Sequence, residues 1–167
     1  WEAEIGVVIG KPARNISLER AHEVIAGYTC VNDLSARDLS TQQDRAGGGM
    51  YMDWLGQKCF DDGCPMGPWI TPAAFVPDPN DIALKLWVNG VEKQNSNSKN
   101  MIHNIAEQIV SLSQHVTLRP GDVIATGTPA GVGAGRGDSG EFLKAGDEVK
   151  VEVQYVGTLT NRMVAGS

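Results

Sequence analysis

The sequence predicts an α+β fold: a mixed, mostly antiparallel β-sheet, rolled or folded into a β-sandwich, with two main helices. Three observations support this class. Short segments rich in Val and Ile that alternate with polar residues outnumber the helical segments. The two helical segments do not alternate with strands, as a doubly wound sheet would require. Asn89-Gly90, between two alternating segments, is a strong signal for an antiparallel hairpin.

The first part of the chain predicts two strands separated by a helix. An apolar strand is expected over 2–10, and apolar residues at positions 21, 24 and 25 mark one face of a helix over 18–26. Ser17 is suited to cap that helix, and Gly27 to end it. After a second strand over 28–32, the polar segment 39–55 holds three consecutive glycines, which indicates a mobile loop.

The remainder predicts a series of strands interrupted by one helix. Ile and Leu recur near the helical period over 101–114, which favours a helix there. Strands are expected over 69–71, 82–88, 91–94, 123–127, 149–156 and 158–163. A length of 167 residues suits one domain. Because the chain opens without methionine, already inside a strand, we expect it to be part of a longer polypeptide.

Composition narrows the class of partner. The chain carries 14 basic and 20 acidic residues, a net charge of −6, and has no Lys/Arg cluster, so a nucleic-acid partner is not expected. No apolar run is long enough for a membrane span and no signal sequence is evident, which predicts a cytoplasmic protein without a membrane partner. Three cysteines without a CxxC pair indicate reduced thiols.

Two glutamates in the first strand suggest a metal site. The period of two places the side chains of Glu2 and Glu4 on the same face of the strand. Neighbouring carboxylates repel one another unless a cation lies between them, and Asp33 at the end of the second strand is the candidate third ligand. The same spacing also occurs on solvent-exposed strand faces that bind nothing, and an aspartate such as Asp33 often caps a helix.

Taken together, the motifs and their order resemble the fumarylacetoacetate hydrolase family over essentially the whole chain. This family includes acylpyruvate hydrolases, decarboxylases and isomerases of oxo-acids, and enzymes of aromatic ring cleavage. The motifs, in order, are Glu-x-Glu at 2–4, Asn-Asp-Leu-Ser-Ala-Arg at 32–37, Lys-x-Phe-Asp at 58–61, Thr-Gly-Thr-Pro at 126–129 and Gly-x-Leu-x-Asn at 157–161.

The resemblance implies a metal centre. In the family, two glutamates two residues apart and an aspartate ligate Mg²⁺, and Glu2, Glu4 and Asp33 match these positions. Mn²⁺ and Ca²⁺ are further candidates, since both also accept carboxylate oxygens. Family members also carry an N-terminal segment whose His/Glu pair activates water, and we expect that segment to be missing from this chain.

The resemblance also implies substrate contacts. Lys58 is expected to be catalytic by neutralising an enolate oxygen, and Arg37 to be catalytic and to bind the acid group; a solvated loop lysine and a surface ion pair are the plain alternatives. Thr128 is expected to touch the substrate carboxylate. Ser40 stands where the family usually has a substrate-binding glutamine. Gln94 either closes the pocket or bonds in the core, and the sequence leaves both open.

The function that the resemblance implies is a Mg²⁺-dependent hydrolase that cleaves a C–C bond of a 2,4-dioxo acid, such as an acylpyruvate or a fumarylacetoacetate-like substrate, through a metal-stabilised enolate. The alternatives are an oxo-acid decarboxylase or isomerase on the same site, and a non-catalytic binding or assembly module. Sheet edges in a domain of this size commonly pair across a two-fold axis, so we expect a homodimer.

Overall fold

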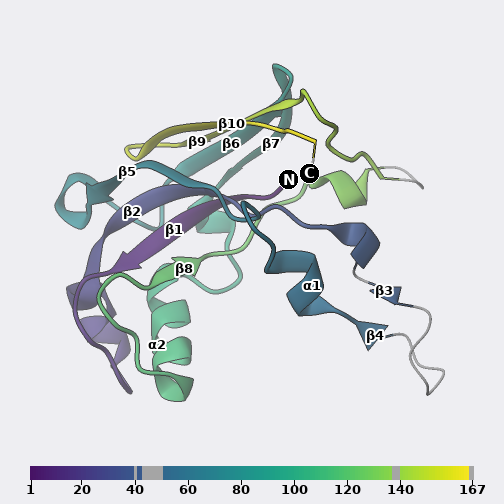
Figure 1. Cartoon of the computed structure of the whole chain (residues 1–167). Coiled ribbons are helices and arrows are strands. Elements are labelled where there is room, and N and C mark those ends of the chain that lie inside the picture. The colour runs from purple at the N-terminus through teal and green to yellow at the C-terminus, as the bar shows by residue number, and fades with distance from the viewer. Residues whose placement is uncertain (40, 43–50, 137–139, 166–167) are drawn as a thin grey trace.

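Two four-stranded sheets pack face to face in the computed structural model, which describes residues 1–39, 41–42, 51–136 and 140–165 (Figure 1). The first sheet has the order β5-β2-β1-β8, with β1 at Ala3–Ile9, β2 at Ile25–Asn32, β5 at Met66–Pro72 and β8 at Val123–Ala125. The second has the order β10-β9-β6-β7, with β6 at Ala83–Val88, β7 at Val91–Asn97, β9 at Glu148–Val153 and β10 at Gly157–Arg162. Every pairing among the described strands is antiparallel, which confirms the predicted α+β class.

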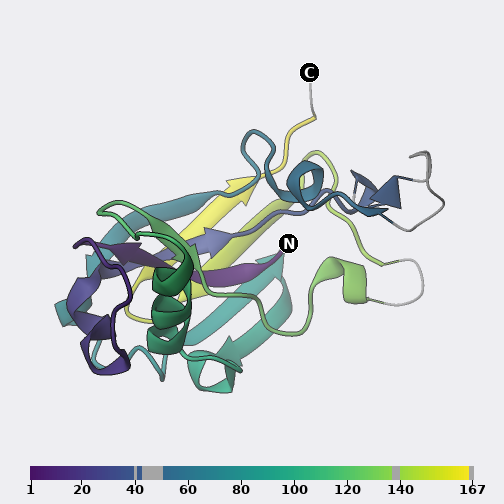
Figure 2. The ribbon, with the colours of Figure 1, turned by 90° about the horizontal axis from the view of Figure 1, so that it is seen from below.

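The helices are short and lie outside the two sheets. The α-helices are α1 at Trp54–Lys58 and α2 at Ile105–His115. The 3-10 helices are η1 at Leu18–Val24, η2 at Arg37–Leu39, η3 at Ala73–Phe75, η4 at Ser98–Asn100 and η5 at Gly133–Gly135. Seen from below, α2 lies beside η1 at one end of the sheets (Figure 2). Among the described residues, no helix combines the length and the hydrophobicity that crossing a bilayer would need.

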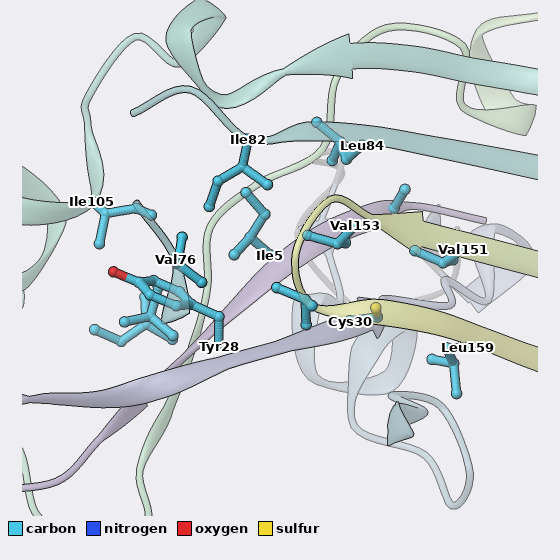
Figure 3. Packing of buried hydrophobic residues seen from close by; sticks show 14 of the residues in the cluster. Ile5, Tyr28, Cys30, Val76, Ile82, Leu84, Ile105, Val151, Val153 and Leu159 are labelled. Atoms are coloured by element: carbon cyan, nitrogen blue, oxygen red, sulfur yellow. The ribbon is translucent and has the colours of Figure 1, made fainter. Parts of the chain in front are cut away.

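The main core lies between the two sheets. Ile5 of β1 and Cys30 of β2 point toward Leu84 of β6 and toward Val151 and Val153 of β9 (Figure 3). All five side chains are at most 3% exposed. Burial of this apolar surface is the main contribution that stabilises the sandwich, and it fixes which face of β1 points inward.

The hairpin predicted at Asn89-Gly90 is confirmed. β6 and β7 pair on either side of it, and both turn residues have positive φ, 50° and 78°. Such values are typical of a type I′ turn, whose twist matches that of the flanking strands. The Asn89 side chain also donates to Asp147 Oδ1 at 2.9 Å and accepts from the Glu148 N–H at 2.9 Å, which ties the turn to β9.

The helix expected over 18–26 forms only in part. The segment forms the 3-10 helix η1, which ends at Val24, and the Ser17 side chain makes no capping hydrogen bond. Ile25 instead pairs with Ile9 as the first residue of β2. A helix this short and without a cap has little stability of its own. The residues at its end therefore pair with β1 as a strand and do not continue the helix.

The helix expected over 101–114 begins four residues later. Asn104 and Glu107 form a reciprocal capping box that starts α2 at Ile105. Ile102, expected on the inward face of the helix, precedes it and is 94% exposed. The helix itself is confirmed.

The loop expected over 39–55 is partly wrong. Residues 41–42 form β3, which pairs with β4 at Tyr51–Met52, and α1 begins at Trp54. Asp53 caps α1 by accepting the Gly56 N–H at 2.8 Å. Ser40 and the three glycines at 47–49 lie outside the described residues.

Candidate functional site

The first strand supplies two carboxylates to one point. Ala3 and Ile5 enter the core, so the period of two sends Glu2 and Glu4 to the opposite face of the first sheet. Asp33 directly follows β2, and its N–H donates to the Glu2 carbonyl at 2.9 Å. One carboxylate oxygen from each of Glu2, Glu4 and Asp33 lies within 4.8 Å of the other two. The three predicted ligands therefore meet.

The chemistry of this carboxylate trio, Glu2, Glu4 and Asp33, fits a hard divalent cation. All three donors are oxygens, and Glu2 and Glu4 are only 9% and 3% exposed. Further groups orient them: Ser35 donates its hydroxyl to Glu2 Oε1 at 3.2 Å, and the Gly127 N–H donates to Glu4 Oε2 at 2.8 Å. Such outer hydrogen bonds are a regular feature of metal sites.

Lys58 lies at the centre of the site. As the last residue of α1 it donates from Nζ to Glu2 Oε2 at 2.9 Å and to Asp33 Oδ2 at 2.8 Å. Burial lowers the pKa of Lys58, but these hydrogen bonds and charges outweigh burial, so the pKa is raised and the ammonium stays charged. Its side chain is 12% exposed, which excludes a freely solvated loop lysine in this structure.

Arg37 reaches the same carboxylates from η2. Its Nη2 lies 3.5 Å from Glu2 Oε1. Arg37, Glu2 and Ser35 also line a pocket of about 640 Å³ that adjoins the trio. The guanidinium is thus placed between the acidic cluster and an open space large enough for a ligand.

Thr128 is held by neighbouring groups. Its hydroxyl donates to the Ala3 carbonyl at 3.0 Å and accepts from Gln94 Nε2 at 2.9 Å. It lines a second pocket, of about 440 Å³, rather than the one beside Arg37. The expected contact of Thr128 with substrate stays a prediction, and the same holds for Ser40, which lies outside the described residues.

Gln94 is a residue whose role the sequence left open. It is 1% exposed and bonds in the core: Oε1 accepts the Ala3 N–H at 2.9 Å, and Nε2 donates to Thr128 and to the Pro129 carbonyl. It thereby fixes the start of β1, and with it the two glutamates, to the Thr-Gly-Thr-Pro turn.

Sequence reasoning did not assign Ser35 and Gly127 to the site. Ser35 stands inside the quoted Asn-Asp motif, so the motif was its only signal. The Thr-Gly-Thr-Pro turn was expected to offer backbone N–H groups to an anion. The anion that accepts the Gly127 N–H in this structure is the Glu4 carboxylate.

The ionised form of Glu4 is unfavourable in this site. Burial raises the pKa of Glu4 to about 7; the Gly127 N–H opposes this shift, and the carboxylates of Asp33 and Glu2 add to it. A carboxylate with such a pKa holds its proton in the weakly acidic range unless a cation displaces it.

Metal affinity should therefore depend on pH. Below the pKa of about 7 a proton competes for Glu4, so the apparent affinity for Mn²⁺ rises with pH and levels off above that value. Between about pH 6 and about pH 8 we expect a gain of roughly tenfold, with about one proton released per ion at the lower pH. Calorimetry in two buffers of different ionisation enthalpy measures both. An affinity that is constant over this range would contradict the role of Glu4.

The sandwich brings three carboxylates to one point, an arrangement that could hold a divalent cation. The family profile described as "Fumarylacetoacetate (FAA) hydrolase C-terminal" matches residues 1–164. The chain belongs to the fumarylacetoacetate hydrolase family, as the motifs predicted.

Individual relatives have different activities. The chain is 41% identical over 158 residues to 2,4-didehydro-3-deoxy-L-rhamnonate hydrolase of Sphingomonas sp. (strain SKA58), covering 95% of this chain and 53% of that protein. The crystal structure of 5-carboxymethyl-2-hydroxymuconate delta-isomerase from Mycobacterium smegmatis is similar with a TM-score of 0.80 and 40% identity, covering 99% of this chain and 59% of the other. Fumarylpyruvate hydrolase from Pseudomonas aeruginosa, in complex with Mn²⁺ and pyruvate, gives a TM-score of 0.84 and 33% identity, covering 99% and 65%. The chain spans about half the length of the curated relatives it matches.

Proposed function

We propose that residues 1–167 form a single catalytic domain of a Mg²⁺-dependent hydrolase that cleaves a C–C bond in a 2,4-dioxo acid of the acylpyruvate or fumarylacetoacetate type. The observation that carries this proposal is the meeting of three carboxylates within 4.8 Å, with the Lys58 ammonium between two of them. An all-oxygen donor set suits Mg²⁺, and it also suits Mn²⁺ or Ca²⁺. The Mn²⁺ in the Pseudomonas neighbour supports a divalent ion.

The residues of the site have different roles. Glu2, Glu4 and Asp33 would hold the cation, which when bound supplies positive charge beside the carboxylate and carbonyl oxygens of the substrate. Lys58 adds a second positive charge at the same point, where negative charge develops on the enolate oxygen as the bond breaks. Arg37, whose planar fork suits a carboxylate, orients the acid group.

Two further contacts complete the proposed site. We propose that the Thr128 hydroxyl, which donates to the Ala3 carbonyl in this structure, binds a substrate carboxylate, and that Ser40 takes the place of the family's glutamine. Overall, water adds across the bond between the methylene carbon and the distal carbonyl. For an acylpyruvate, the methylene carbon gains a proton to give pyruvate, and the acyl carbon gains the oxygen to give a carboxylic acid.

A second candidate function is isomerisation or decarboxylation of a related oxo-acid. The similarity to the Mycobacterium delta-isomerase, at 40% identity, favours it. The same stabilised enolate can take up a proton elsewhere, or form by loss of CO₂, when no water attacks the distal carbonyl. The carboxylate trio and Lys58 would serve either reaction.

The test uses the complete natural polypeptide, purified and loaded with Mg²⁺. Acetylpyruvate and oxaloacetate are supplied separately, and the expected result is equimolar pyruvate and acetate from the first, lost with a chelator and restored by added metal. Release of CO₂ or enol–keto exchange alone would replace the hydrolase with the second candidate. No turnover together with no Mn²⁺ binding would leave a non-catalytic binding or assembly module.

We further propose that the protein is a homodimer. β5 lies at the edge of the first sheet and leaves Met66, Trp69 and Ile70 exposed by 50%, 60% and 54%. An edge strand with apolar side chains in water is a site where a second chain gains stability by covering it. This surface supports the expected dimer.

A further inference from the structure

The 640 Å³ pocket extends the metal site in one direction. Glu2 belongs both to the carboxylate trio and to the pocket lining, and Ser35 and Arg37 lie at the same end. Its volume lies in the range that holds ligands of drug size, which is far more space than the three carbons of a pyruvate unit fill. A substrate that reaches the trio with its acid end therefore has room for a long remaining part.

The lining away from the trio is apolar. Trp1 from the start of the chain, Phe60 from the segment after α1, Phe142 and Leu143 from the segment before β9, and Met163 after β10 contribute to it. Phe60 and Phe142 are 39% and 53% exposed, so their rings offer uncovered apolar surface to the space. Such surface is covered favourably by a hydrocarbon group.

The charges of the lining disfavour an anion there. The described lining residues include three acids, Glu2, Asp38 and Glu141, and one base, Arg37. Arg37 stands at the metal end beside Glu2, and Glu141 is held by Lys93 at 2.7 Å. Arg136 Nε also lies 3.9 Å from Glu141, and Lys93 and Arg136 lie 5.8 and 5.9 Å from the centroid of the Trp1 ring. The cations at the apolar end therefore already face the Glu141 carboxylate. A second carboxylate there would lose water and compete with Glu141 for them, which is costly.

We propose that this pocket receives the acyl tail of the substrate and selects a long, uncharged hydrocarbon tail over one that ends in a second carboxylate. This inference rests on the proposed function and narrows its substrate class to acylpyruvates with alkyl or aryl tails. Phe142 is the specificity-determining residue that is most open to test, because it is exposed and touches neither the carboxylate trio nor Lys58 in any hydrogen bond or ion pair of the described structure.

Three substrates distinguish selectivity for the tail from the ability to cleave the C–C bond. Acetylpyruvate has almost no tail, while hexanoylpyruvate and adipoylpyruvate have six-carbon acyl groups that differ only in a terminal methyl or carboxylate. With the complete, Mg²⁺-loaded polypeptide we expect kcat/KM for hexanoylpyruvate to exceed that for acetylpyruvate by at least about tenfold, since each buried methylene contributes a few-fold. We expect adipoylpyruvate to fall below hexanoylpyruvate by at least about tenfold.

A charge variant tests the position of the tail. Phe142→Arg should lower the ratio of kcat/KM for hexanoylpyruvate over adipoylpyruvate by at least about tenfold, because the new cation meets the terminal carboxylate. Phe75→Arg, at a side chain on η3 that is 71% exposed and does not line the pocket, should leave that ratio unchanged. Mn²⁺ affinity measured on both variants shows that the fold is intact.

The outcomes are distinct. Cleavage of acetylpyruvate combined with equal or better use of adipoylpyruvate would overturn the inference and leave the proposed function standing. A ratio that Phe142→Arg does not move, in a variant that binds Mn²⁺ normally, would also overturn it. Failure with all three substrates would overturn the proposed function, and this inference with it.

Discussion

Replacing Glu4 with Gln is expected to weaken Mn²⁺ binding by a factor of about 100 or more and to abolish turnover, yet to stabilise the metal-free protein near pH 8. Loss of a direct ligand should exceed the 10–100-fold cost of losing an outer hydrogen bond. The stabilisation follows from the raised pKa of Glu4: above about pH 7 the buried carboxylate is charged beside Asp33 and Glu2, and Gln removes that charge. The amide oxygen can still accept the Gly127 N–H. The gain in unfolding free energy should be on the order of 1 kcal/mol.

Calorimetry measures the metal affinity, and thermal unfolding with and without Mn²⁺ measures stability. Glu148→Gln, at an exposed carboxylate in β9, is the matched control and should change neither quantity. A Glu4→Gln protein that binds Mn²⁺ as tightly as the parent would remove Glu4 from the metal site.

Replacing Lys58 with Met is expected to lower kcat by about 10²–10³ and to destabilise the metal-free protein, the opposite sign from Glu4→Gln. The rate falls because the charge that faces the developing enolate is lost, and removing one such group typically costs this much. Stability falls because the carboxylates of Glu2 and Asp33 lose the ammonium that lies 2.9 and 2.8 Å from them. Breaking a partly buried ion pair in this way leaves uncompensated charge.

Added metal should reverse much of that loss. A divalent ion replaces the missing positive charge, so Mn²⁺ should raise the Tm of Lys58→Met by more than it raises the Tm of the parent. Lys99→Met, at an exposed lysine in η4, provides the control for loss of one charge. Parental kcat in Lys58→Met would show that this lysine takes no part in the reaction.

Local sequence pattern was enough to predict part of the site. The period of two in the first strand places Glu2 and Glu4 together, and the same period on β6 predicts its inward face. The position of Lys58 could not be predicted from a local pattern, because α1 has only five residues and shows no apolar periodicity. Its position beside Glu2, 56 residues away along the chain, depends on tertiary packing that no local pattern encodes.

The predicted helix boundaries were wrong where two local signals competed. Ile102 fits the apolar period of the following helix, but the capping box of Asn104 and Glu107 starts the helix after it. At Ile25 a helix period competed with strand pairing, and pairing to Ile9 prevailed. Gln94 could not be assigned, because its partners Ala3 and Pro129 lie 91 and 35 residues away.

The register of β1 has a consequence for how this chain tolerates insertions and deletions. Ala3 pairs with Asn32 across the sheet. Adding or removing one residue ahead of Ile5 would therefore turn every earlier side chain to the opposite face of the sheet. Carboxylate side chains would then enter the apolar space between the two sheets, and apolar side chains would take their places at the proposed metal site. Single-residue length changes at the start of this strand should therefore abolish foldability and chemistry in one step, whereas many point substitutions there would damage only one of the two.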